Sequence, residues 1–259
     1  MMGGVVSKST FTYYLLPLIH FCHFMIMIPS LNSEASADTN GAPRLSGFMR
    51  WRLKFAFWVS ALFSPYLIIP FGTVALVASV TRTTEDFLLW TSLCILFTTV
   101  IPVLFIIVQI LRGKITDVHV MERHQRNAPF LVAVLSAAIG ALVMKYYGAR
   151  LEIWGVALVF AINGLVLYCI TAGWKISIHV AVLSAAILAG AVMIPNLDWR
   201  LVGWTIPLII WARYVRKRHT AWQGLMGFVV AILITSASIF VLYRLYNISF
   251  MHVVRERLL

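Results

Sequence analysis

Residues 87–111 read FLLWTSLCILFTTVIPVLFIIVQIL, a run without a single charged side chain. An α-helix needs about 20 predominantly apolar residues to cross the hydrocarbon core of a bilayer. The run therefore predicts a transmembrane helix, and similar blocks recur along the chain. They occupy residues 55–80, 87–111, 129–147, 152–171, 176–194, 200–214 and 222–245. The sequence thus predicts an all-α fold, a polytopic transmembrane helical bundle of about seven spans.

The overall composition is also that of a membrane protein. Of the 259 residues, 61% are hydrophobic and 12% are charged, whereas a soluble domain carries about 25% charged residues. The formal net charge is +12, and in a membrane protein such an excess lies beside anionic headgroups or phosphate ligands. The basic residues form no long soluble patch, so we expect the lipid bilayer as a partner and no nucleic acid.

The N-terminal residues form a segment of their own. Residues 11–29 are apolar, and a polar stretch follows up to Gly47. Lys8, this block and Ala35-Ser36-Ala37 are typical of a secretory signal with an A-x-A cleavage site, but the block also fits an uncleaved extra span. We therefore expect an N-terminal segment over 1–47 and a transmembrane domain over 48–259.

Polar side chains gather at three span boundaries that lie on one membrane face if successive spans alternate in direction. The three clusters are Lys114, Asp117, His119, Arg123 and Arg126, then Lys175, Ser177 and His179, then Arg213 and His219. Ionisable residues at membrane depth are costly and usually mark a functional site. Cations, a hydroxyl and two imidazoles suit the binding of a phosphate group and its transfer to a histidine. This chemistry requires neither a metal nor a cofactor.

Two of these clusters have the spacing of known motifs. Arg213-Tyr-Val-Arg-Lys-Arg-His219 contains Arg-x5-His, and Ser177-Ile-His179 contains Ser-x-His. With the basic cluster upstream, the order resembles that of the type 2 phosphatidic acid phosphatase superfamily, the lipid phosphate phosphatases. That family carries a Lys followed by Arg-Pro, then Pro-Ser-Gly-His, then Ser-Arg-x5-His-x3-Asp.

The resemblance implies a metal-independent hydrolase that acts on a lipid phosphate through a phosphohistidine. It implies that His219 is the nucleophile and His179 the general acid. The phosphate-binding set would be Lys114, Arg123, Arg126, Ser177 and Arg213, supported by Asp117, His119, Lys175 and Gln223. Phosphatidate and isoprenoid diphosphates are both admissible substrates, and the oligomeric state is left open. The family's usual site faces outward, so the motif face is expected on the periplasmic or luminal side.

The chain departs from the family pattern in each motif. Gln223 stands where the family has Asp, so it can hold the imidazole tautomer but cannot stabilise an imidazolium by charge. Asn127 follows Arg126 where the family has Pro, and the glycine before His179 is absent. Two spans also separate the first motif from the second. These departures predict a divergent member.

Other interpretations remain open from the sequence. A phosphatase-like protein without catalysis would bind a lipid phosphate, and a transporter would use the same cations to guide an anion, although they gather at one face. Asp117, His119 and His124 would be an alternative metal site. The run from Arg216 to Arg218 is interpreted as a solvated basic loop near lipid phosphates.

Overall fold

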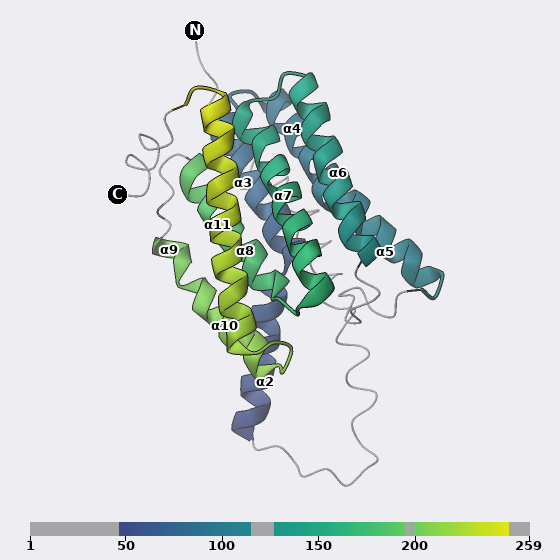
Figure 1. Ribbon diagram of the computed structural model, residues 1–259, viewed down its shortest axis with the longest axis vertical. Coiled ribbons are helices and arrows are strands. Elements are labelled where there is room, and N and C mark those ends of the chain that lie inside the picture. The colour runs from purple at the N-terminus through teal and green to yellow at the C-terminus, as the bar shows by residue number, and fades with distance from the viewer. Residues whose placement is uncertain (1–46, 115–126, 195–197, 199, 249–259) are drawn as a thin grey trace.

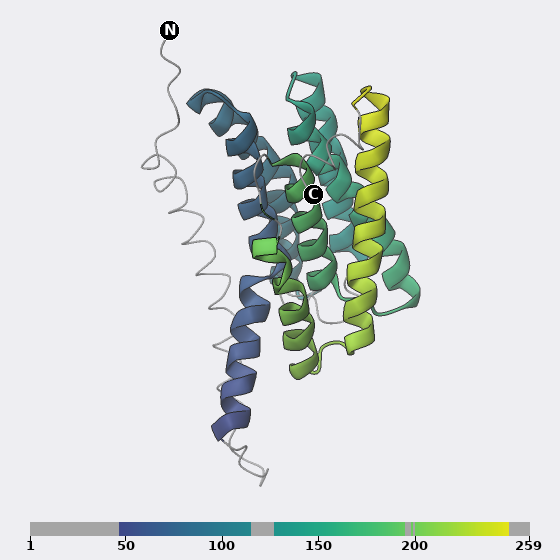
Figure 2. The same cartoon turned by 90° about the vertical axis from the view of Figure 1, so that its left-hand side faces the viewer.

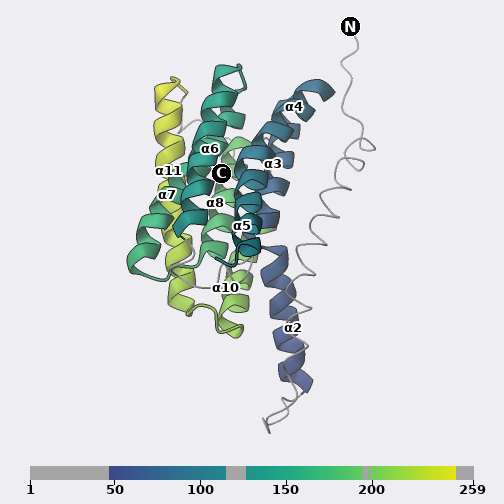
Figure 3. The ribbon, with the colours of Figure 1, turned by 90° about the vertical axis from the view of Figure 1, so that its right-hand side faces the viewer.

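The computed structural model describes residues 47–114, 127–194, 198 and 200–248. These ranges fold into helices without any strand, which confirms the predicted all-α class. Figures 1 to 3 show the longer helices side by side along one axis, with α2 extending beyond the bundle. The elements are α2 (Gly47–Leu62), α3 (Pro65–Val80), α4 (Thr84–Ile95), η1 (Leu96–Val100), α5 (Ile101–Leu111), α6 (Asn127–Tyr146), α7 (Leu151–Gly173), α8 (Ile178–Met193), α9 (Arg200–Gly203), α10 (Thr205–Val215) and α11 (Ala221–Leu245).

Four helices are long and apolar enough to cross a membrane, and the bent pair α2–α3 makes a fifth if it is one span. The four are Thr84–Leu111, Asn127–Tyr146, Leu151–Gly173 and Ala221–Leu245. The predicted number of seven is not confirmed. The apolar blocks 176–194 and 200–214 form helices of 16 and 11 residues, α8 and α10. At 1.5 Å per residue these extend about 24 and 17 Å, short of a core about 30 Å thick.

Two prolines shape the first half of the bundle. Ser64 precedes Pro65 and has an extended backbone (ψ 150°), because proline disfavours the helical conformation in the residue before it. Helices α2 and α3 therefore meet at a bend of 44°. Pro102 lies just after the π-helical turn η1, whose wider turn accommodates a ring that would clash with the preceding turn of a regular α-helix.

Buried polar contacts and close packing hold these helices together. Ser136 of α6 donates a hydrogen bond of 2.6 Å to the carbonyl of Phe97 in η1. Asn163 of α7 donates to Thr235 of α11 at 3.1 Å, which joins the two long helices inside the bundle. Large apolar side chains remain exposed on the outer faces, as expected for helices surrounded by lipid. Among them are Leu89, Leu104, Leu135, Leu142 and Leu233.

Candidate functional site

The start of α8 lies directly against the start of α11. The backbone N–H of Ser177 donates to the carbonyl of Gln223 at 3.3 Å. One turn further along α11, a Cβ added at Gly227 would come within 2.8 Å of the Ser177 carbonyl oxygen. Glycine at this position therefore allows the two backbones to approach, and this approach brings the second and third sequence clusters together (Figure 1).

We expect Gly227→Ala to destabilise the protein by about 1–3 kcal/mol, because the new methyl group meets backbone that cannot rotate away. The shift would also separate Ser177 from Gln223. Thermal unfolding of detergent-purified protein measures the effect. Gly72→Ala in α3 is the matched control, since its Cβ would meet nothing within 4 Å. The control is expected to be neutral or slightly stabilising. Equal unfolding temperatures for the two variants would contradict the close contact.

The first turn of α11 orients the imidazole of His219. Thr220 caps the helix, and its backbone N–H donates to Gln223 Oε1 at 3.1 Å. The same Oε1 lies 3.2 Å from His219 Nδ1. An amide oxygen only accepts hydrogen bonds, so Nδ1 must carry the proton and Nε2 the lone pair. Gln223 Oε1 therefore favours the Nδ1–H tautomer of the neutral imidazole, and a nucleophilic role for Nε2 stays a prediction.

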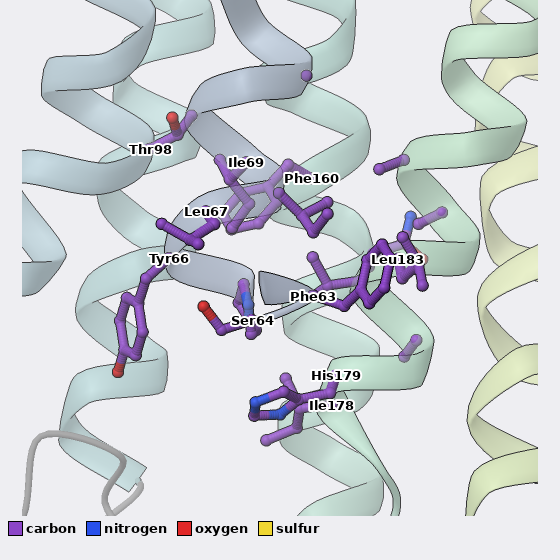
Figure 4. A pocket seen from close by; sticks show the side chains of 18 of the residues that line it. Phe63, Ser64, Tyr66, Leu67, Ile69, Thr98, Phe160, Ile178, His179 and Leu183 are labelled. Carbon is purple, nitrogen blue, oxygen red and sulfur yellow. The ribbon is translucent and has the colours of Figure 1, made fainter. Parts of the chain in front are cut away.

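A cavity of about 900 Å³ lies inside the bundle, and the two predicted catalytic histidines are among the residues that line it. Its polar wall contains His179 from α8 and His219 from the α10–α11 turn, together with Arg213, Arg216 and Arg218. Figure 4 shows His179 among apolar neighbours such as Phe63 and Leu183. No carboxylate occurs among the described residues that line the cavity. The arrangement combines a cationic end with an apolar interior.

Arg213 lies in the last turn of α10 and is only 9% exposed. Its carbonyl accepts the backbone N–H of Arg218 at 3.0 Å, which folds the basic loop back over the end of the helix. A cation at a helix C-terminus also interacts favourably with the helix dipole. Arg213 is therefore a buried basic residue of the cavity lining, at the end of a helix.

Arg216 and Arg218 also line the cavity, whereas the sequence was interpreted as placing them in a solvated loop. The Arg216 Cζ lies 5.0 Å from the centroid of the Phe57 ring of α2. Burial, and then the charge of Arg218, lower the pKa of Arg216 from its ordinary value. The group nevertheless stays cationic at neutral pH, because that ordinary value is very high. Arg213 and Arg216 are three residues apart, so a helix places them next to each other on its surface. This spacing is the signal in the sequence that could have grouped Arg216 with Arg213.

Other predicted site residues lie away from the cavity wall. Ser177 is fully buried and does not line the cavity, and its hydroxyl has no hydrogen-bond partner within the described ranges. Lys175 and Lys114 are exposed, and neither lines the cavity. The predicted site residues Arg123, Arg126, Asp117 and His119 lie outside the described residues. The N-terminal segment 1–47 also lies outside them, except for its last residue, Gly47.

A metal centre finds no support in the part of the chain that the structure describes. Among those residues, no group of three or more His, Cys, Asp or Glu side chains is placed to hold a metal ion. The alternative set Asp117, His119 and His124 lies outside them.

Comparison with known proteins found that no protein-family model, no curated protein and no solved structure matches this chain.

Proposed function

We propose that this chain is an integral membrane phosphatase that hydrolyses a lipid phosphate through a phosphohistidine at His219. One observation carries the proposal. Two histidines and three arginines, from segments about 35 residues apart in sequence, line a single cavity that is otherwise largely apolar. A cationic pocket that opens into an apolar cavity suits a ligand with an anionic head and a hydrocarbon tail.

In the first step, Nε2 of His219 attacks phosphorus, and the bond from phosphorus to the lipid oxygen breaks. His179 donates a proton to that oxygen, so that the lipid leaves as an alcohol. Arg213 lines the same cavity as His219. It would neutralise the phosphoryl oxygens as charge develops on them, with Arg216 and Arg218 adding positive potential. The Gln223 amide keeps the Nδ1 proton of His219 in place throughout.

In the second step, water attacks the phosphohistidine. His179, now neutral, takes a proton from this water, and the P–N bond breaks to return the electron pair to Nε2. Inorganic phosphate leaves, and the next turnover begins with His179 protonated again. The apolar walls hold the lipid tail and limit the access of bulk water to the phosphoryl group.

The direct test is phosphate release by detergent-purified protein, with EDTA present, from phosphatidate, farnesyl diphosphate and undecaprenyl diphosphate. We expect release from at least one of the three that is insensitive to EDTA. Absence of release from all three by folded protein would overturn the proposal. Binding without release would then favour a catalytically silent lipid-phosphate protein, and flux across vesicles a transporter.

Gln223 offers a second test, since its amide stands where a charged acceptor would strengthen the site. Gln223→Glu keeps the length of the side chain and the capping box with Thr220, and it adds a negative charge next to His219 Nδ1. The charge would stabilise the positive ring that forms during phosphoryl transfer, so we expect kcat to rise at least about tenfold. Initial rates of phosphate release measure the change.

Thr220→Ala is the control for this experiment. It removes the cap to the Gln223 N–H, at a cost of about 1 kcal/mol, and leaves the contact between Gln223 and His219. Its unfolding temperature is expected to fall with little change in kcat. A lower kcat for Gln223→Glu than for the parent would mean that the site requires a neutral acceptor at this position.

A further inference from the structure

The first half of α2 lies outside the packed core of the bundle. The buried residues of this helix, Ala56, Val59 and Ser60, all belong to its second half. Residues 47–51 are exposed, and Figures 2 and 3 show this end of α2 projecting past the neighbouring ends of α10 and α11. In a bilayer, a segment that projects beyond the spans lies at the level of the lipid headgroups.

One face of this projecting segment is a ladder of aromatic rings. Phe48, Trp51 and Phe55 follow one another at spacings of three and four residues, so they share a helix face. The ring centroids lie 6.4 Å apart for Phe48 and Trp51 and 5.5 Å apart for Trp51 and Phe55. All three side chains are exposed. Exposed aromatic residues in this arrangement are typical of a helix that contacts the interface of a membrane.

Cations alternate with the aromatic residues along the same segment. Arg50 and Lys54 are exposed, and the Arg52 Cζ lies 5.8 Å from the centroid of the Phe48 ring. Helix α2 contains no Asp or Glu. The three cations are therefore not compensated by an acidic residue of their own helix.

The charges of the described residues are distributed unequally along the bundle axis. Further basic residues lie at the ends of α5 and α10, before α8 and before α11, which is the end of the bundle where α2 begins. They are Arg112, Lys114, Lys175, Arg213, Arg216, Lys217 and Arg218. The acidic residues of the described ranges lie in the first turns of α4 and α7 and before α9. They are Glu85, Asp86, Glu152 and Asp198. No carboxylate among the described residues therefore competes with an anion for the cations of α2.

We infer that the start of α2 is a binding surface for anionic phospholipid headgroups of the adjacent leaflet. Arg50, Arg52 and Lys54 pair with the headgroup phosphates, and the aromatic ladder lies in the region between the headgroups and the acyl chains. A basic residue beside an anionic membrane surface contributes about fivefold in affinity. Three such residues without an acidic neighbour complement a negatively charged headgroup region better than a zwitterionic one.

The test compares dioleoyl phosphatidylglycerol, which is anionic, with dioleoyl phosphatidylcholine, which has the same acyl chains and no net charge. Native mass spectrometry of the detergent-purified protein measures the affinity for each lipid. We expect the parent to bind phosphatidylglycerol at least about tenfold more tightly. The variant Arg50→Gln/Arg52→Gln/Lys54→Gln should reduce this preference at least about fivefold, because it removes the charges and keeps polar side chains.

The matched control is Arg82→Gln/Arg150→Gln/Arg244→Gln, which removes three exposed cations at the opposite end of the bundle, where acidic side chains also lie. The preference for phosphatidylglycerol should hardly change in this protein. Equal affinities of the parent for the two lipids would overturn the inference, as would an equal loss of preference in both triple variants. A parent dimer that dissociates in the α2 variant alone would also overturn it, because a second copy would then cover this surface.

Tryptophan fluorescence tests the contact without changing a charge. In nanodiscs that contain both lipids, brominated phosphatidylglycerol should quench the parent more strongly than brominated phosphatidylcholine does. Trp51→Phe should reduce this difference, since phenylalanine retains a ring in the ladder and removes the emission from this position. Trp204→Phe is the control, because Trp204 is 60% exposed and Trp51 59%, but Trp204 caps α10. A difference that persists in Trp51→Phe and disappears in Trp204→Phe would contradict the assignment to α2.

The inference is independent of the proposed function. The phosphate of phosphatidylglycerol is a diester, whereas the proposed reaction acts on a terminal phosphate group. A chain that releases no phosphate can therefore still show the preference for phosphatidylglycerol. A chain that lacks this preference can still be a phosphatase.

Discussion

The His219→Asn variant is expected to release phosphate at least about 10⁴-fold more slowly than the parent protein. Asparagine retains an N–H donor close to the position of Nδ1, so the contact with Gln223 Oε1 and the start of α11 should persist. It lacks the Nε2 lone pair that attacks phosphorus. The substitution therefore removes the nucleophile with little change in the shape of the turn. Initial rates and unfolding temperatures of detergent-purified protein measure both quantities.

His252→Asn is the control, because it makes the same chemical change at a histidine that belongs to none of the three polar clusters of the sequence. It is expected to retain the parent rate. A complementary measurement is quenching with alkaline detergent after the addition of ³²P-labelled substrate, which should trap an alkali-stable phosphoenzyme in the parent and none in His219→Asn. Acid treatment should then release the label. Parental turnover in His219→Asn would rule out the phosphohistidine mechanism.

Arg213→Met is expected to reduce kcat by about 10²–10³-fold, the usual effect of removing one preorganised group that stabilises transition-state charge. Methionine is unbranched and apolar like the stem of arginine, so it fills much of the same space along α10. Arg213→Lys keeps a cation but loses the planar fork that binds two phosphoryl oxygens, and its kcat should lie between those of the parent and the methionine variant. Initial rates with saturating lipid phosphate distinguish the three proteins.

Arg150→Met is the matched control for the loss of an arginine. The Arg150 side chain is 54% exposed and pairs with Glu152 at 3.4 Å on the opposite end of the bundle. Exposed ion pairs contribute about 0–1 kcal/mol, so both stability and rate should hardly change. An equal loss of activity in Arg150→Met and Arg213→Met would indicate a general effect of charge and would contradict a specific role for Arg213.

The sequence predicted the all-helical fold class, whereas the predicted number of seven spans is not confirmed. Apolar runs such as 87–111 and 222–245 indicate helices whatever their neighbours do, because a backbone in lipid must satisfy its own hydrogen bonds. The same pattern in 176–194 and 200–214 predicted full spans. The chain there forms shorter helices, and Pro65 divides the block 55–80 at a bend. Hydropathy measures how apolar a run is, and it does not report where helices end.

Within the candidate site, the sequence alone determined what depends on a short spacing along the chain. His219 lies just before the Thr220 cap of α11, and Gln223 is the third residue of that helix, so the capping box brings the Gln223 amide to the imidazole. The sequence predicted this contact. Tertiary structure decided which segments share a cavity. The close approach of Gly227 to Ser177 joins α11 to the start of α8, where Ser177 is fully buried. Packing also brings Arg216 to the cavity, because complementarity of shape between distant helices leaves no signature in local spacing.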